Sequence, residues 1–235
     1  MLARILRHTA ALERQHVLGH LGWLRGAIGA ALGIFVAGGT TMIVVGHADG
    51  LLPWLIAPLG ASAMLVFCVP ASPLAQPWPV IGGSLISAAT GLAAGHFLGS
   101  PWLASGAAVG MAIALMTLAR CLHPPGGACA LLCALGSTGA EVWGAFHLLP
   151  VAANVLALAA TGWLYNNLTG HPWPHTMPKI PVTTAPAVTP SYQREDLEAV
   201  LEEWDEILDV DIDDLDALFQ AVERRGLTRA LSGAS

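Results

Sequence analysis

Apolar residues dominate the chain in six blocks that short polar turns separate. The blocks cover residues 26–46, 51–69, 80–98, 102–119, 124–139 and 143–165. Each is near or somewhat under the roughly 20 residues that a helix needs to cross a bilayer. The fifth block is the shortest and begins with two prolines, so a re-entrant helix is an alternative for it. The pattern predicts an all-α membrane protein with about six transmembrane segments.

A short sequence pattern occurs in both the second and the fifth block. The two copies are Pro58-Leu-Gly-Ala-Ser-Ala-Met-Leu65 and Pro125-Gly-Gly-Ala-Cys-Ala-Leu-Leu132, and they agree at five of eight positions. Lipid cannot satisfy the backbone groups that a proline-glycine break exposes, so such a break persists only where it faces protein or a cavity. Two breaks at matching places in two halves of a chain indicate the binding site of a transporter.

The repeated pattern predicts two halves of opposite orientation. Segments one to three and four to six would form a 3+3 inverted repeat, and the middle segment of each half would be a broken helix. The N-termini of the two broken helices would converge in the interior, where their N–H donors and partial positive charge favour a small anion. The residues expected to bind the substrate are Gly60, Ala61, Ser62, Gly126, Gly127 and Ala128.

Other polar residues lie close to the breaks. His123 directly precedes the second break, and Arg120 lies one turn before it. Histidine changes its charge near neutral pH, so His123 is either a gating or proton-linked residue or an anchor at a helix end. Arg120 has the same two interpretations, and anchoring is favoured. The third block carries hydroxyl groups at helical spacing that could line a polar pathway: Ser84, Ser87 and Thr90.

The charged residues are concentrated outside the apolar blocks. The chain is 54% hydrophobic and 11% charged, and its formal net charge is −6. Between residues 26 and 178 the only formally charged residues are Asp49, Arg120 and Glu141, whereas residues 194–225 hold thirteen acids and three bases. The negative charge therefore belongs to the C-terminal tail, and no basic face for nucleic acid is present.

Composition divides the chain into four parts. These are a basic N-terminal segment (1–25), a transmembrane domain (26–170), a Pro-rich linker (171–190) and an acidic tail (191–235). Apolar residues at helical spacing predict a helical hairpin in the tail, with Asp211 as the N-cap of its second helix. The apolar face of this hairpin would dock on the membrane domain or on a partner copy.

The distribution of arginines predicts the orientation of the chain. Four arginines precede the first block, and none occurs in the turns at residues 47–50 and 99–101. Positive charge favours the cytoplasmic side, so both termini, and with them the acidic hairpin, are expected in the cytoplasm. The expected location is the inner membrane of a bacterium.

The sequence contains none of the familiar catalytic or metal-binding motifs. No nucleophile–base pairing, HExxH motif or phosphate loop is readable. The acidic run Asp209–Asp216 does not fit a calcium loop, because Asp214 and Gln220 stand where such a loop needs Gly and Glu. We therefore expect no enzyme, no catalytic residue, no metal and no cofactor.

Three motifs in order resemble the HPP family of integral membrane proteins, which is named after its His-Pro-Pro motif. They are Cys121–Ala128, Ala57–Ala63 and Pro70–Pro77, and the likeness covers about residues 20–170. The acidic tail resembles segments that follow the membrane region in bacterial members. The resemblance implies four or more membrane helices. Plant-plastid and cyanobacterial members are linked to nitrite transport, so the resemblance also implies nitrite as a candidate substrate.

Two classes of function compete on this evidence. The leading hypothesis is a permease or channel for a small monovalent anion, with nitrite favoured over nitrate, formate and bicarbonate. The second is a non-transporting membrane regulator that signals through its acidic tail. A membrane-embedded enzyme is a third hypothesis that rests only on His123 and Arg120. Small residues throughout the apolar blocks favour close helix packing and a homo-oligomer, most simply a homodimer.

Overall fold

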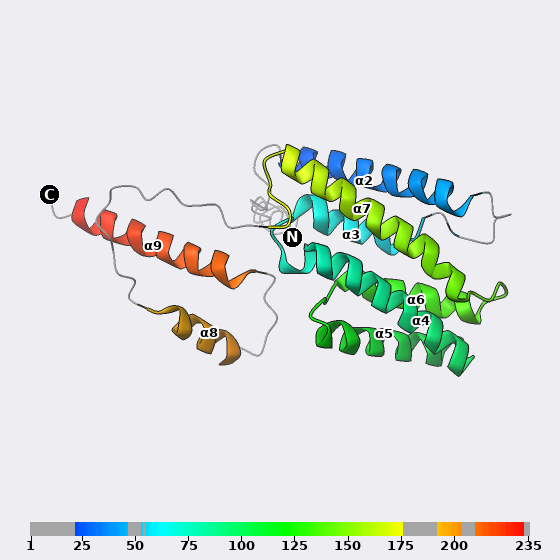
Figure 1. The fold of residues 1–235 in the computed structure, drawn as a ribbon. Helices are drawn as coiled ribbons and strands as arrows, with labels where there is room; N and C mark the ends of the chain where they lie inside the picture. The colour runs from blue at the N-terminus through cyan, green and yellow to red at the C-terminus, as the bar shows by residue number, and fades with distance from the viewer. Residues whose placement is uncertain (1–21, 47–52, 54, 176–191, 204–209, 233–235) are drawn as a thin grey trace, which may run out of the picture.

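The structure is a bundle of apolar helices followed by two tail helices (Figure 1). The computed structural model describes residues 22–46, 53, 55–175, 192–203 and 210–232. Every regular element in this part of the chain is helical. The helices are α2 (Gly22–Val45), α3 (Pro58–Cys68), α4 (Ser84–Leu98), α5 (Pro101–Leu118), α6 (Pro124–Thr138), α7 (Leu148–Leu168), α8 (Arg194–Glu203) and α9 (Ile212–Ser232). Three shorter turns are η1 (Pro73–Ala75), the π-helical η2 (Pro79–Gly83) and η3 (Ala145–His147).

Four of the expected spans are long and apolar enough to cross a membrane. They are α2, η2 with α4, α5, and η3 with α7. The other two are short, because α3 has 11 residues and α6 has 15. At 1.5 Å per residue they reach only about 16 and 22 Å, against about 30 Å of hydrocarbon. The expectation of six full spans is therefore corrected to four long helices and two short ones, and the expected span 51–69 is reduced to α3.

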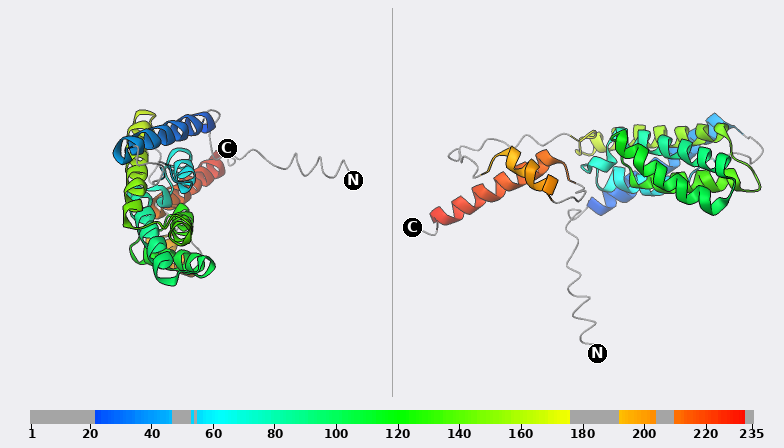
Figure 2. Two further views of the ribbon diagram at one scale, coloured as in Figure 1. Left: turned by 90° about the vertical axis from the view of Figure 1, so that its right-hand side faces the viewer. Right: turned by 90° about the horizontal axis from the view of Figure 1, so that it is seen from below.

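The helices form two groups, one that contains α3 and one that contains α6 (Figures 1 and 2). Helix α2 packs on α3 and α7, while α5 packs on α4 and α6. Helices α4 and α6 share the most extensive contact and run in the same direction. α2 and η2 begin at the same end of the bundle at which α3, α5 and α7 end.

Glycines bring α4 and α6 into direct backbone contact. A Cβ atom on Gly91 would lie 2.3 Å from the carbonyl oxygen of Ala130, and one on Gly95 would lie 2.4 Å from the Cβ of Ser137. No real side chain tolerates such distances, so the two helices can approach this closely only at glycine. This contact fixes the position of α6 beside α4.

The short helix α3 is held at both ends by polar side chains. Ahead of its first turn, the amide of Ile56 donates to Asn154 Oδ1 at 3.0 Å. At its last turn, Asn166 Nδ2 donates to the carbonyl of Val66 at 2.9 Å, and Arg25 Nη2 donates to the next carbonyl at 2.7 Å. Both asparagines belong to α7 and are completely buried. They satisfy backbone groups that lipid could not.

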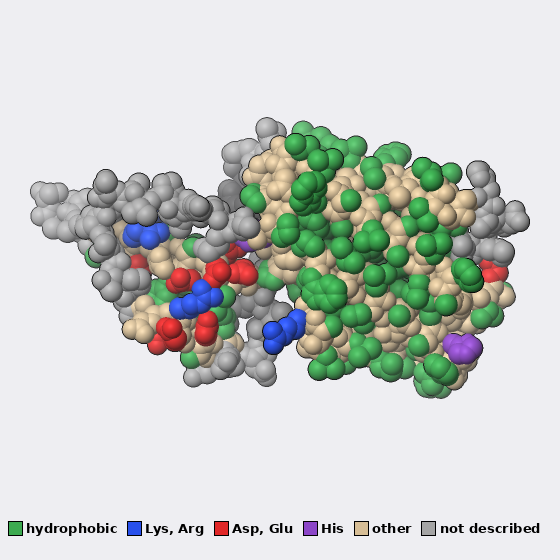
Figure 3. Space-filling view, viewed as in Figure 1, with side chains coloured by type: hydrophobic (Ala, Val, Ile, Leu, Met, Phe, Trp, Pro, Cys, Tyr) green, Lys and Arg blue, Asp and Glu red, His purple; other side chains and the backbone are tan. Residues whose placement is uncertain are grey.

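The tail carries most of the acidic side chains. In Figure 3 hydrophobic side chains cover the visible face of the bundle, while Asp and Glu side chains gather over the tail helices. Asp211 Oδ1 accepts a hydrogen bond from the amide of Asp213 at 2.9 Å, which is the expected N-cap of α9. Leu218 and Val222 are exposed on α9. The turn between α8 and α9, and most of the expected segments 1–25 and 171–190, lie outside the described residues.

We expect the substitution Gly91→Ala to destabilise the bundle, since overpacking of this kind costs about 1–3 kcal/mol or more. The matched control is Gly110→Ala on α5, where a Cβ atom meets nothing within 4 Å. The control should be neutral or slightly stabilising, because alanine is the better helix former. Thermal unfolding of the purified protein in detergent measures both, and equal midpoints would contradict the close α4–α6 contact.

Candidate functional site

Ser62 and His123 meet where the two short helices begin. Ser62 lies near the start of α3, and His123 is the N-cap residue of α6. The Ser62 Oγ and His123 Nε2 atoms are 2.8 Å apart, although the residues are 61 positions apart in the sequence. The residues are 2% and 0% exposed. The sequence placed Ser62 at the first proline break and His123 at the second. In the folded chain these two residues are hydrogen-bonded to each other.

The second ring nitrogen of His123 determines which tautomer is present. His123 Nδ1 lies 2.9 Å from the carbonyl oxygen of Leu74 in η1. A carbonyl can only accept, so Nδ1 carries the proton and donates it. A charged ring would be costly at a position that is closed off from solvent, so we assign the neutral ring, in which Nε2 accepts from the Ser62 hydroxyl. The pair is therefore a neutral imidazole with a serine hydroxyl bonded to it.

The two prolines after His123 explain its conformation. A residue before proline is excluded from the helical region, and His123 is accordingly extended, with φ −138° and ψ 106°. The side chain therefore points away from the axis of α6. Pro124 and Pro125 have no N–H group, so the helix begins inside the bundle with two fewer donors to satisfy.

Gly83 in the π-helical turn η2 forms the floor beneath His123. A Cβ atom on Gly83 would lie 2.6 Å from the carbonyl oxygen of Cys121 and 2.7 Å from the Cβ of His123. Only glycine fits there, and π-helical turns are common at functional sites. Sequence analysis missed Gly83 and Leu74. The Gly82-Gly83 doublet was an available signal for the first, but the sequence gives none for a backbone carbonyl.

The hydroxyl residues of α4 lie inside the bundle. Ser84, Ser87 and Thr90 are all buried. Ser87 is the one closest to the start of α6, because a Cβ atom on Gly126 would lie 2.6 Å from Ser87 Oγ. Thr90 Oγ1 donates to the carbonyl of Ile86 in its own helix. Ser87 and Gly126 thus come together, and the Ser87 hydroxyl donates to Met116 Sδ at 3.3 Å.

The other residues expected to bind the substrate are less enclosed. Gly60, Ala61 and Ala128 lie on the exposed sides of their helices, and Gly127 is half-buried. The amide of Gly60 donates to the carbonyl of Ala57 at 3.1 Å, and the amide of Gly126 donates to the carbonyl of His123 at 2.8 Å. These first-turn amides bond back to the preceding turn. They are therefore not free donors, contrary to the expectation for Gly60 and Gly126.

Arg120 lies at the end of α5 and not in this site. Its side chain is exposed, and its backbone has a positive φ of 53°. The amides of Arg120 and Cys121 donate to the carbonyls of Thr117 and Met116, which closes the C-terminus of α5. Among the described residues Arg120 makes no hydrogen bond to Ser62 or His123. This position fits the anchoring interpretation.

The contact between Ser62 and His123 has the geometry of a nucleophile and its base. Both side chains are closed off from solvent, and no acidic side chain within the described residues hydrogen-bonds to His123. In the same part of the chain no group of three His, Cys, Asp or Glu side chains could hold a metal ion. The chemistry that the pair offers most directly is the uptake and release of one proton.

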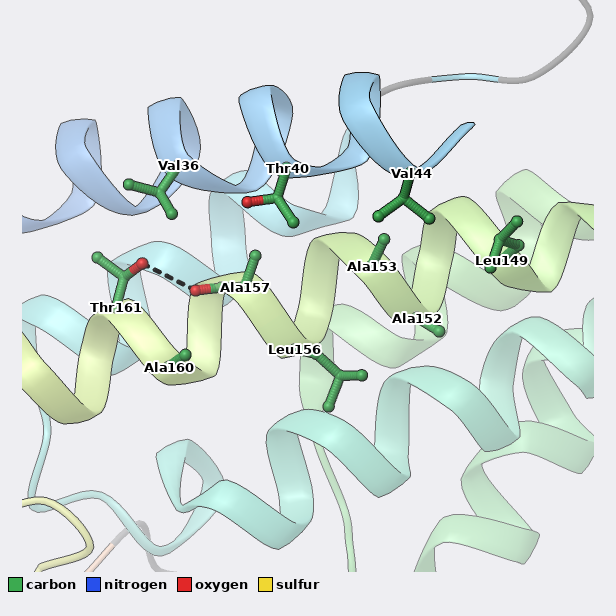
Figure 4. A pocket seen from close by; sticks show the side chains of 10 residues that line it. All are labelled: Val36, Thr40, Val44, Leu149, Ala152, Ala153, Leu156, Ala157, Ala160 and Thr161. Atoms are coloured by element: carbon green, nitrogen blue, oxygen red, sulfur yellow. Dashed lines mark hydrogen bonds between the residues drawn. The ribbon is translucent and has the colours of Figure 1, made fainter. Parts of the chain in front are cut away.

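A groove of about 470 Å³ lies elsewhere, between α2 and α7 (Figure 4). Its lining is apolar apart from Thr40 and Thr161, and Thr161 Oγ1 donates to the carbonyl of Ala157. Neither Ser62 nor His123 lines it. A groove of this composition on a membrane helix pair suits hydrocarbon and not a small anion.

Comparison with known proteins gives one family and two relatives. The family model described as "HPP, transmembrane region" matches residues 15–174. A transmembrane protein of Dictyostelium discoideum is 36% identical over 125 residues, which are 51% of this chain and 43% of the relative. A second transmembrane protein of that organism is 35% identical over 120 residues, or 48% and 38%. The chain thus matches less than half the length of each curated relative. No solved structure matches the chain.

We expect His123 to be neutral and protonated on Nδ1 at neutral pH. The measurement is ¹⁵N NMR of protein labelled on histidine, with the His123 signals assigned by their loss in His123→Gln. Nδ1 should resonate as a protonated nitrogen and Nε2 as an acceptor. The control Ser105→Ala, which removes a hydroxyl bonded within α5, should leave these signals unchanged. Protonation on Nε2 instead would contradict the assigned hydrogen bonds.

Proposed function

The chain belongs to the HPP transmembrane family and is an integral membrane protein, and on this premise we propose that it is a permease or channel for a small monovalent anion, with nitrite as the favoured substrate. The observation that carries the proposal is the hydrogen bond between Ser62 and His123. It joins the second turn of the short helix α3 to the N-cap residue of the short helix α6. Broken helices that meet at depth are where transporters bind their substrates.

The arrangement of the helices supports an inverted repeat. In a 3+3 repeat α2, α3 and α4 would correspond to α5, α6 and α7. The contact of α2 with α3 would then match that of α5 with α6, and the contact of α2 with α7 would match that of α5 with α4. All four contacts are present. The halves are unequal, since α3 is four residues shorter than α6.

The charge of an anion must be balanced inside the bundle. Placing an unpaired charge among apolar groups is costly, and the amides of Gly60 and Gly126 are already engaged. Arg120 does not reach the site. Among the described residues at this site, His123 is the one that can supply positive charge, by accepting a proton on Nε2.

Protonation of His123 would also free a hydrogen-bond donor. In the neutral pair, the Ser62 hydroxyl donates to His123 Nε2 at 2.8 Å, and the Pro58 carbonyl at 3.5 Å is a longer, second acceptor. Once Nε2 carries a proton it becomes the donor, and the Ser62 oxygen becomes the acceptor. The Ser62 O–H group can then rotate toward an anion. One proton thus provides both a positive charge and a donor, so a proton and an anion would bind together. Ser87 on α4 lies against Gly126 near the start of α6, close to this pair.

We expect saturable nitrite uptake into liposomes that contain the purified protein, faster when the outside is acidic. Protein-free liposomes correct for nitrous acid that crosses lipid unaided, and nitrate and formate serve as competitors. Ser62→Ala should lower uptake about three- to tenfold, the factor that corresponds to one hydrogen bond. Ser105→Ala on α5 is the matched control and should be unaffected. No saturable flux from folded protein would refute the transport proposal.

A regulator that signals through the tail is the second candidate function. It is favoured by a contact between the end of the membrane region and α9, where His175 Nε2 lies 2.9 Å from Asp214 Oδ2. Such a contact gives the tail a physical connection to the bundle.

Deletion of residues 191–235 separates the two candidates. A transporter should retain most of its nitrite flux, because Ser62, His123 and their neighbours are all present in the shortened chain. Flux in the same liposome assay, alongside the full-length protein at equal incorporation, measures this. Loss of all activity from a shortened protein that still folds would favour the regulator.

A further inference from the structure

Gln76 closes the loop that presents the Leu74 carbonyl to His123. This loop, residues 70–76, connects α3 to the turn before η2. Gln76 Nε2 donates to the carbonyls of Pro70 at 2.9 Å and of Ser72 at 2.8 Å. The amide of Leu74 donates to Ser72 Oγ at 3.2 Å. One side-chain amide therefore holds the two sides of the loop together, and with them the carbonyl that orients the histidine.

Residues 173–175 follow α7 and form a strap. This strap donates two hydrogen bonds to the same loop. Trp173 is 2% exposed, and its Nε1 donates to the carbonyl of Ala75 at 3.0 Å. The amide of His175 donates to Gln76 Oε1 at 2.8 Å. Asn167 Nδ2 donates to the carbonyl of Trp173 at 2.7 Å, which ties the strap to α7. Every hydrogen-bonding atom of the Gln76 side chain is thus engaged.

The strap also reaches the acidic tail. The His175 side chain pairs with Asp214 in the first turn of α9. Both side chains are partly exposed, at 20% and 27%. A continuous set of contacts therefore runs from α9 through His175, Gln76 and the Leu74 carbonyl to His123 and Ser62.

We infer that Gln76 is a positioning residue for the Ser62–His123 pair and that the acidic tail acts on this pair through it. Gln76 does not touch the substrate position. It fixes the Leu74 carbonyl, the carbonyl fixes the tautomer of His123, and the tautomer makes Nε2 available for the proton. Loss of the His175–Asp214 contact would loosen the strap and, with it, the loop. The consequence for transport rests on the proposed function, but the effect on His123 does not.

The first test replaces the glutamine with a side chain of similar shape that makes no hydrogen bonds. In Gln76→Met the ratio of the two neutral His123 tautomers, read by ¹⁵N NMR, should fall about three- to tenfold, the factor for one ordinary hydrogen bond. Nitrite uptake should fall by a similar factor, and its pH profile should shift. The matched control is Gln220→Met in α9, where the amide bonds only to Asp216. An unchanged tautomer ratio in folded Gln76→Met overturns the inference.

The second test leaves Gln76 in place and acts from the tail. Asp214→Ala removes the partner of His175, while Asp213→Ala, one residue earlier, removes only a partner of Arg194 within the tail. Amide hydrogen exchange over residues 70–76 should be about two- to fivefold faster in Asp214→Ala, as expected for the loss of one partly exposed hydrogen bond. Equal exchange in the two variants would show that the tail does not act through this loop. Both readouts decide the inference even if wild-type protein moves no nitrite.

Discussion

A helix that begins inside a bilayer leaves backbone groups that no solvent can satisfy, and the fold solves this problem twice. For α3 the solution is buried asparagine, since Asn154 accepts ahead of its first turn and Asn166 donates to its last. For α6 it is the residue type itself, because Pro124 and Pro125 have no N–H group to satisfy. Ser62 and His123 lie on the two short helices that these contacts stabilise. The candidate site lies where these two short helices meet inside the bundle.

The site carries no fixed charge, and this determines what it can bind. A neutral imidazole bonded to a neutral hydroxyl is stable among apolar groups, because each polar atom has a partner. A lysine or arginine in the same place would hold an anion too tightly to release it, whereas conduction requires weak binding. If the protein is the proposed anion transporter, a histidine that becomes charged only together with its substrate would meet both requirements. The Ser62 hydroxyl can remain bonded to the ring in both states. It donates to the neutral ring, and its oxygen accepts when Nε2 is protonated.

The polar contacts that orient the site come from outside the two short helices. The Leu74 carbonyl lies in a loop, Gln76 braces that loop, and the strap that contains Trp173 and His175 holds both. The acidic tail joins this set through Asp214. Parts of the chain at one end of the bundle are therefore in contact, directly or through one another, with a buried pair. The inferred coupling would give the acidic tail a route to the interior of the membrane domain.

The sequence by itself determined the helical class, the position of the two breaks, the family and the cap at Asp211, because these depend on residue type and on spacing along one helix. Ser62 and His123 were also identifiable, since each follows or precedes a proline break. What only the tertiary structure decided is that the two residues are partners, because a contact across 61 positions depends on how α3 and α6 pack. Only the tertiary structure could also identify the Leu74 carbonyl as the partner of His123. Every residue has a backbone carbonyl, so residue type gives no signal for this role. The same holds for Gly60 and Gly126, whose amides bond to the preceding turn because of local backbone geometry that residue identity does not reveal.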